Sequence, residues 1–397
     1  MKAATNHTRR LVHVPPNVIA LALVAFFSGF GQDMISPALP GFLIAIGASH
    51  TLIGLIDGLL NGSTALFRLV SGIASDRLRK RKELVLLGYA LSSVARPLLA
   101  IAGPLATIAT LRTMDGVGKG MKDAPRDALI AESSDGRRGR AFGFQRLVDT
   151  AGSVVGPILA TALLVLLGTT IWSYRLIFAL AAIPGAIALG LIVFAVRENE
   201  STKQSRRTGH KKFPLVFWIF LVGSILASLT RVNDALVLVR AGDLGVPVAW
   251  IPALFAAFTL LYAVCSYPIG IWSDKIGKLP ILVAGWSVLA FVEMVFGASH
   301  SLLGAIPAFA SYGLFYALTE GSGRAIIGDL VPDEIRGTAY ALFHFSTGLA
   351  LIVGGWGIGK IWDTGSPQTA FYLSACGSLV AALVIWSALR ISDRSHE

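Results

Sequence analysis

The sequence predicts an all-α polytopic membrane protein with twelve transmembrane helices in two pseudo-symmetric six-helix bundles. Three observations predict it: an apolar composition, basic residues in alternate connections, and an internal repeat. The 397 residues are 54% hydrophobic and only 14% charged, whereas soluble domains carry about 25% charged residues. Twelve helices of about 20 residues need roughly 240 positions. The length therefore leaves room for short loops and two short tails.

Apolar segments of spanning length run through the whole chain. The predicted spans are residues 18–38, 51–73, 84–103, 104–124, 141–167, 172–196, 214–236, 248–272, 280–297, 301–328, 338–360 and 368–391. One long hydrophilic stretch lies at the midpoint, so we expect an N-terminal bundle over 1–196, a cytoplasmic linker over 197–213 and a C-terminal bundle over 214–397. No small-residue cleavage site follows the first apolar segment, so this helix is expected to be retained.

Basic residues gather in every second connection. The N-terminal tail, the even-numbered connections and the C-terminal tail are basic, whereas the odd-numbered connections hold only Arg175, Arg240 and Lys360. This positive-inside pattern places both termini in the cytoplasm of a cell membrane, the inner membrane if the source is bacterial. The net charge of +11 is thus explained by topology, and no nucleic-acid partner is expected.

The polar chemistry of an enzyme or metal protein is missing from the sequence. Cys265 and Cys376 lie inside apolar runs, which argues against a disulfide framework or a thiolate metal site. The seven histidines do not cluster, and there is neither a nucleotide-binding loop nor a nucleophile–base pair. We therefore expect that the protein is not an enzyme and that it has no cofactor and no metal site. We also expect it to be a monomer in the lipid bilayer.

Four short motifs occur in the same order in both halves. The Gly-x-x-Ser-Asp-Arg-x-x-Lys motif at 72–80 recurs at 270–278 with lysine for arginine, and the Arg-Gly-x-Ala-Phe motif at 138–142 recurs at 336–340 with tyrosine for phenylalanine. Asp-Gly-x-Gly-Lys at 115–119 matches Glu-Gly-x-Gly-Arg at 320–324, and Gln32-Asp33 matches Asn233-Asp234. A duplicated six-helix unit with a site at the interface of its copies is the architecture of secondary transporters.

On these motifs the chain resembles the major facilitator superfamily along its whole length. Residues 72–81 resemble the signature between the second and third helices, except that Arg79 replaces a usual glycine, which Gly277 keeps in the second copy. Residues 112–118 resemble the fourth-helix motif, with Asp115 where glutamine is common. Gly152-x-x-x-Gly156-Pro157 and the Pro-x-x-Pro at 37–40 resemble patterns of the twelve-helix drug:proton antiporter branches. The resemblance implies proton-coupled efflux of a small molecule by alternating access.

Ionisable residues inside the predicted spans indicate the candidate site, because each costs about 2.5–3.5 kcal/mol at the bilayer centre. The resemblance implies that the first, fourth, seventh and tenth helices line a central, water-filled cavity. The candidate cavity residues on these helices are Asp33, Arg112, Asp115, Lys119, Arg231, Asp234, Glu320 and Arg324.

The same charges have a structural interpretation. Arg112–Asp115, Arg146–Asp149 and Arg231–Asp234 are three residues apart, and Glu320–Arg324 are four apart. Each pair could therefore neutralise itself within one helix, or its members could pair across helices and hold them together. Asp33 has no such neighbour and is the candidate proton carrier or substrate contact. Asp57, Arg96 and Glu293 lie in other helices, where scaffold roles are expected.

Two motifs are candidates for gating. Asp76 and Asp274 are expected to begin tight cytoplasmic turns as helix N-caps. The resemblance adds that Gly72, Asp76, Arg77 and Asp274 latch the two halves in one state. Gly152, Gly156 and Pro157 would either permit close helix packing or control closure of the fifth helix.

The sequence does not identify the substrate. An alternative to export is a proton-coupled importer of a small anionic metabolite, because Arg112, Lys119, Arg231 and Arg324 suit a carboxylate or phosphate. Metal efflux is a further alternative, because it is suggested for some bacterial relatives that resemble residues 118–127.

Overall fold

The computed structural model describes residues 14–78, 80–134, 138–198, 213–332 and 335–394, and every regular element in these ranges is helical. For some helical residues, among them Asp76, Arg77 and Arg324, the side chains lie outside the described part. The all-α prediction is confirmed for the described chain.

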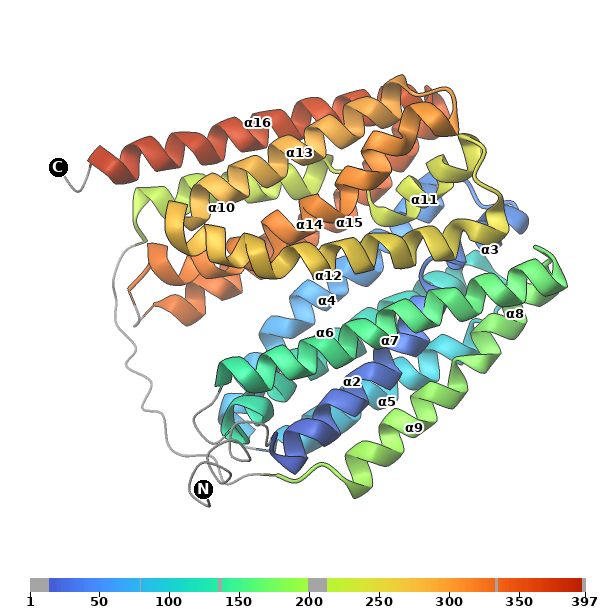
Figure 1. Cartoon of the computed structure of the whole chain (residues 1–397), viewed down its shortest axis with the longest axis horizontal. Coiled ribbons are helices and arrows are strands. Elements are labelled where there is room, and N and C mark those ends of the chain that lie inside the picture. The colour runs from blue at the N-terminus through green and yellow to red at the C-terminus, as the bar shows by residue number, and fades with distance from the viewer. Residues whose placement is uncertain (1–13, 79, 135–137, 199–212, 333–334, 395–397) are drawn as a thin grey trace, which may run out of the picture.

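The helices form two groups along the chain (Figure 1). The first group consists of α2 (Pro16–Ile35), α3 (Leu39–Ala45), α4 (His50–Leu78), α5 (Arg81–Leu98), α6 (Leu105–Glu132), α7 (Arg138–Leu167), α8 (Ile171–Leu180) and α9 (Ala182–Phe194). The second group consists of α10 (Leu215–Thr230), α11 (Asp234–Asp243), the 3₁₀ turn η1 (Val248–Trp250), α12 (Ile251–Ile276), α13 (Lys278–Ala298), α14 (Leu302–Leu330), α15 (Arg336–Thr364) and α16 (Pro367–Arg394).

Two of the predicted spans are broken at related places. The first is interrupted between α2 and α3, where Pro37 lacks the amide that would continue the helix. The seventh is interrupted between α10 and α11, where Arg231 is extended and the Asn233 side chain caps α11 by accepting a hydrogen bond from the Leu236 amide at 3.1 Å. Both breaks lie next to an aspartate, Asp33 in one half and Asp234 in the other.

Ten helical segments of the described chain are long and apolar enough to cross a membrane. α5 and α6 occupy the places of the third and fourth predicted spans but are not among the ten. Both helices carry many charges, which lower their hydropathy. The fourth span was also expected to end at 124, whereas α6 continues through Pro125 to Glu132.

The halves meet through two helix pairs, α4 with α15 and α7 with α12. Glycines allow the first pair to approach closely: a Cβ on Gly54 would lie 2.1 Å from the Gly355 carbonyl oxygen, and one on Gly359 would lie 2.4 Å from that of His50. The Asn233 amide also donates to the Gly54 carbonyl at 2.9 Å, across the interface. Small residues thus bring the two backbones into contact.

The halves are joined most firmly at the end of the molecule that holds α3, α8 and α11, which we call the closed end (Figure 1). A single hydrophobic cluster there includes Phe42, Tyr174, Leu236 and Phe371, which come from both halves. On the same side, the Asp363 carboxylate accepts hydrogen bonds from the amides of His50 at 3.0 Å and Thr51 at 2.8 Å. The described ends of the chain, at α2 and α16, lie at the opposite end.

Asp76 and Asp274 do not begin helices, and the N-cap prediction is wrong. Asp76 lies in the last turn of α4 and Asp274 in the last turn of α12. The reason is that each helix continues past the apolar segment into the polar motif before it ends.

Candidate functional site

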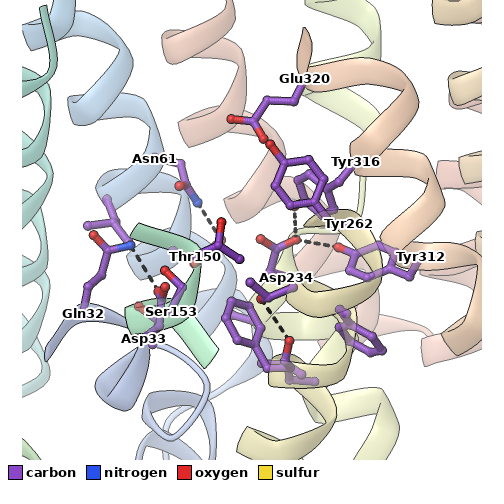
Figure 2. Close-up of a pocket in the computed structure, with 18 of the residues that line it drawn as sticks. Gln32, Asp33, Asn61, Thr150, Ser153, Asp234, Tyr262, Tyr312, Tyr316 and Glu320 are labelled. Carbon is purple, nitrogen blue, oxygen red and sulfur yellow. Dashed lines mark hydrogen bonds between the residues drawn. The ribbon is translucent and has the colours of Figure 1, made fainter. Parts of the chain in front are cut away.

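A cavity of about 230 Å³ lies between the two halves (Figure 2). Nearly all of its lining comes from long helices that face one another across the interface. The lining residues are Gln32, Asp33, Ser36, Asp57, Leu60, Asn61, Lys119, Arg146, Asp149, Thr150, Ser153, Asp234, Ala235, Leu238, Phe255, Phe258, Thr259, Tyr262, Tyr312, Tyr316 and Glu320.

The wall contributed by the N-terminal half is polar. Asp33, near the end of α2, is 8% exposed and accepts a hydrogen bond from the Gln32 amide at 3.2 Å. Asn61 donates to the Asp57 carboxylate at 3.0 Å one turn away on α4. Thr150 and Ser153 project from α7 toward the same space, as Figure 2 shows. This wall offers carboxylates, amides and hydroxyls.

The wall contributed by the C-terminal half is aromatic around one carboxylate. Asp234 accepts hydrogen bonds from the hydroxyls of Tyr312 and Tyr316, both at 2.5 Å (Figure 2). The two tyrosine rings stand edge to face, with centroids 5.5 Å apart, and Phe258 packs against Tyr312 in the same manner at 5.4 Å. Such edge-to-face contacts hold aromatic rings in fixed orientations.

Arg146 on α7 crosses from one wall to the other. Its guanidinium lies 5.1 Å from the ring centroid of Tyr262 and 3.5 Å from the Glu320 carboxylate, and it also donates to the Tyr262 hydroxyl. Tyr262 belongs to α12 and Glu320 to α14, so the contact joins the halves across the cavity. Arg146 therefore pairs with the opposite half, although the spacing had suggested Asp149 as its partner.

Arg112 and Asp115 lie behind the cavity wall and are not part of its lining. Arg96 and Arg112 both donate to the Asp115 carboxylate, at 3.0 and 3.2 Å, and all three residues are at most 3% exposed. Arg96 also donates to the carbonyl of Ser28 and to the side chain of Gln32. The cluster thus ties α5 and α6 to α2, next to Asp33.

A second buried group lies behind the other wall. Glu293 on α13 is 1% exposed and accepts hydrogen bonds from the hydroxyls of Ser374 and Ser378 and from the amide of Val232. Val232 lies in the break between α10 and α11, so Glu293 holds this break. Arg231, next to it, places its guanidinium 5.7 Å from the ring centroids of both Phe315 and Tyr316.

Four of the eight predicted cavity residues line the cavity: Asp33, Lys119, Asp234 and Glu320. Arg112, Asp115 and Arg231 lie behind its walls, and the side chain of Arg324 lies outside the described residues. The structure therefore brings the predicted acidic groups together more completely than the predicted basic groups.

The predicted gating residues fall at two places. Gly152 and Gly156 on α7 pack against α2, where added Cβ atoms would lie 2.1 Å from the Phe26 carbonyl oxygen and 2.3 Å from that of Phe30. Pro157 is buried within α7, which continues through it. Gly72 faces Ala124 of α6, Asp274 is exposed, and the side chains of Asp76 and Arg77 lie outside the described part.

The sequence-based reasoning missed several cavity residues, most of them on helices outside the expected four and two of them on the tenth. Asp57 was expected to have a scaffold role but lines the cavity, as do Arg146, Asp149 and three tyrosines. A signal was available: Tyr312, Tyr316 and Glu320 are spaced four apart, which places them on one helical face. A search for charged residues inside the spans does not find tyrosine, because its side chain is neutral at neutral pH.

Two apposed helical groups with a polar cavity between them are an arrangement that secondary transporters share. A family profile described as the Major Facilitator Superfamily matches residues 21–230 and again 219–397. The chain therefore belongs to the Major Facilitator Superfamily, a family of membrane transporters and not of enzymes. The predicted two-repeat architecture is confirmed by this match.

Relatives and solved structures agree with this assignment. The chain is similar to the uncharacterised MFS-type transporter MJ1317 of Methanocaldococcus jannaschii, with 32% identity over 93% of this chain and 94% of the relative. It is also similar to the multidrug resistance protein MdtH of Edwardsiella ictaluri, with 24% identity over 90% of each chain. A solved POT family transporter in complex with 5-aminolevulinic acid superposes with a TM-score of 0.78 over 95% of this chain and 96% of that one, at 13% identity, which shows the fold alone.

A third relative is named for a specific substrate. The probable 4-methylmuconolactone transporter of Cupriavidus pinatubonensis is 26% identical over 82% of this chain and 78% of that one. The names of these relatives describe transport or drug resistance, and they do not share one substrate.

Proposed function

We propose that this protein is a secondary active transporter that exports a small molecule in exchange for protons by alternating access. The two halves would rock about the central cavity, which opens to one side of the membrane at a time. The closed end supports this proposal, because a shared apolar cluster and the hydrogen bonds of Asp363 join the two halves there, at one end of the described chain.

The proposal includes a topology. Twelve spans follow if α5 and α6 cross the membrane with the ten apolar segments, and 18 residues of α5 give a helix about 27 Å long. The proposed domains are an N-terminal bundle over 1–196, a linker over 197–213 and a C-terminal bundle over 214–397. The basic connections support cytoplasmic termini in the cell membrane, with the closed end outside, and we expect a monomer.

The observation that carries the proposal is Asp33, a carboxylate inside the central cavity that forms no ion pair with any described residue. A buried charge of this kind is costly, and protonation removes the cost. Asp33 would therefore carry the proton, and its neutral form would allow the cavity to close without substrate.

The other predicted residues take roles that follow from their positions. Lys119, Asp234 and Glu320 would contact the substrate, Arg324 would add to the cavity charge, and Arg112, Asp115 and Arg231 would hold the walls. Gly72, Asp76, Arg77 and Asp274 would latch the cytoplasmic ends. Gly152, Gly156 and Pro157 would keep α7 close to α2 during the motion.

Export is favoured over import by two observations. MdtH, named as a multidrug resistance protein, aligns over 90% of the chain. The α7 glycines that pack closely against α2 belong to a motif that resembles one of the antiporter branches. The second candidate is proton-coupled import of a small anionic metabolite. It is supported by Lys119 and Arg146 in the lining and by the relative named as a 4-methylmuconolactone transporter. Metal efflux lacks comparable support, since no group of three or more potential ligands occurs among the described residues.

The sign of the driving pH gradient tests the proposal. Proteoliposomes would be given a panel of labelled, permanently charged or neutral compounds with the lumen either acidic or alkaline. Accumulation that requires an acidic lumen and disappears with nigericin supports exchange for protons. Accumulation that requires an acidic exterior would instead establish proton symport, and protein-free vesicles control for passive partition.

A further inference from the structure

We propose that the substrate is a small organic cation, and that Arg146 marks the place where its cationic group binds. This inference deepens the proposed transport function by naming its substrate class. It rests on the charge of the lining, on the aromatic wall and on the contacts of Arg146.

The lining is acidic. Among the side chains that the structure describes, it holds five carboxylates, Asp33, Asp57, Asp149, Asp234 and Glu320, and two basic groups, Lys119 and Arg146. Protonation of Asp33 alone would still leave four carboxylates against two bases. The excess of carboxylates favours a positively charged ligand over an anion at every step of a proton-coupled cycle.

The buried groups behind the walls do not reverse this balance. Among the described residues four of these are basic and two are acidic: Arg96, Arg112, Lys122, Arg231, Asp115 and Glu293. Lys122 of α6 belongs to this group because it is buried and donates to the Ser28 hydroxyl of α2 at 2.7 Å. The excess of two positive charges is smaller than the excess of three carboxylates in the lining. Moreover, Asp115 already binds both Arg96 and Arg112, so these guanidinium groups are not presented to the cavity.

The aromatic wall suits the same class of ligand. Tyr262, Tyr312, Tyr316, Phe255 and Phe258 all belong to the lining of the C-terminal half. A cation over the face of such a ring gains about 0.5–2 kcal/mol, and several rings around quaternary ammonium form a known kind of binding cage. A purely hydrophobic substrate would not need the carboxylates that accompany these rings.

The Arg146 side chain already places an organic cation, its own guanidinium, against this wall. Its guanidinium lies against the Tyr262 ring, with the Glu320 carboxylate 3.5 Å away. These are the two interactions that an ammonium or guanidinium ligand would use. Half of the Arg146 side chain is exposed, so the residue can swing aside. A substrate cation would replace it on Tyr262 and Glu320 and release the two halves from each other.

The test is a ligand series on the purified wild-type protein in detergent, measured by calorimetry at pH 7. Phenyltrimethylammonium, N,N-dimethylbenzamide and benzenesulfonate share one ring and carry positive, zero and negative charge, and their small size suits a cavity of about 230 Å³. We expect the cation to bind about tenfold more tightly than the amide and the sulfonate not to bind. Equal affinity for cation and amide, or a preference for the sulfonate, would overturn the proposal.

Variants then locate the cationic group. Glu320→Gln and Tyr262→Leu should each weaken cation binding severalfold and leave amide binding unchanged, whereas Tyr262→Phe should keep most of the affinity because the ring remains. Arg146→Gln should tighten cation binding, because the internal competitor is removed. Unchanged or weaker binding in a folded Arg146→Gln protein contradicts the assigned position.

The outcome is separate from that of the transport proposal. Binding is measured without a membrane or a pH gradient, so a failure of proton-driven export leaves the cation preference intact. Conversely, gradient-driven transport of neutral compounds by a protein that does not prefer the cation would overturn only the substrate class. The wild-type series requires no variant to fold.

Discussion

The two walls of the central cavity come from related halves and differ in chemistry. Asp33 and Asp234 occupy matching places, each at a break in the first helix of its half. Asp33 accepts a hydrogen bond from the side-chain amide of Gln32, whereas Asp234 accepts two hydrogen bonds from tyrosine hydroxyls. The difference indicates that duplication preserved the fold while the walls separated into a polar side and an aromatic side. Under the proposed mechanism the polar side would bind the proton and the aromatic side the substrate.

The buried groups behind the walls repeat this contrast. In the N-terminal half, Arg96 on α5 binds α2 and α6. In the C-terminal half, Glu293 on α13 binds α16 and the break before α11. Each of these two helices is the third predicted span of its half. Arg96 holds α2, which carries Asp33, and Glu293 holds the break before α11, which carries Asp234. The two buried charges have opposite signs.

The largest expected effect separates the two aspartates. Asp33→Asn should reduce proton-driven accumulation in proteoliposomes to the level of protein-free vesicles, because an amide cannot carry the proton. Asp234→Asn should keep the dependence on the pH gradient but bind substrate more weakly. If Asp33→Asn retained gradient-driven transport, the polar wall would not be the proton site.

The second prediction compares the buried charges. Arg96→Met leaves Asp115 with one partner and should destabilise the protein by about 3–5 kcal/mol. Glu293→Gln removes a charge but keeps a hydrogen-bonding group and should cost about 1–3 kcal/mol. Thermal unfolding followed by tryptophan fluorescence in detergent measures both effects. Lys80→Met, at an exposed position, is the control and should leave the unfolding temperature unchanged; equal losses in all three would refute the assignment.

The third prediction compares a contact within one half with a contact between halves. Gly152→Ala should lower stability by about 1–3 kcal/mol, because the added methyl group meets the α2 backbone. Gly54→Ala meets the α15 backbone and should instead part the halves at the closed end. The distance between spin labels at the exposed positions Trp172 and Leu303 would then increase.

Matched control positions exist on two of the helices that form these contacts, α7 and α15. Gly143 of α7 and Gly357 of α15 have open space where a Cβ would be added, so Gly143→Ala and Gly357→Ala should change neither the unfolding temperature nor the label distance. If Gly54→Ala lowered the stability but left the distance between the two spin labels unchanged, the prediction that α4 and α15 separate would be wrong.

The smallest expected effect concerns the Asp363 contact at the closed end. The Asp363 carboxylate accepts hydrogen bonds from the backbone amides of His50 and Thr51. Asp363→Asn should weaken these hydrogen bonds. The carboxylate is 25% exposed, so the change should shift the population of the closed end by about 1 kcal/mol or less. The same spin-label distance should show a modest broadening, and a shift larger than that of Gly54→Ala would reverse the proposed ranking.

The candidate site was predictable in part. Charge inside an apolar segment identified Asp33, Lys119, Asp234 and Glu320, because burial without function is costly. Arg112 and Asp115 share a helical face with Lys119, yet that face is wide enough to meet both the cavity and α5. Whether a residue turns toward the cavity or toward Arg96 depends on the position of the neighbouring helix. The spacing of residues along one helix carries no information about that position.

The sequence by itself determined the membrane class, the duplication and the superfamily, because hydropathy and repeated motifs are properties of single segments. Only the tertiary structure decided which charges pair: Arg146 with Glu320, Asp115 with Arg96, and Asp234 with two tyrosines. It also placed two of the predicted arginines, Arg112 and Arg231, behind the walls, which leaves more carboxylates than basic groups among the described lining residues. The physical reason is that a pair of charges is selected by distance in space, and helices distant in the chain set that distance.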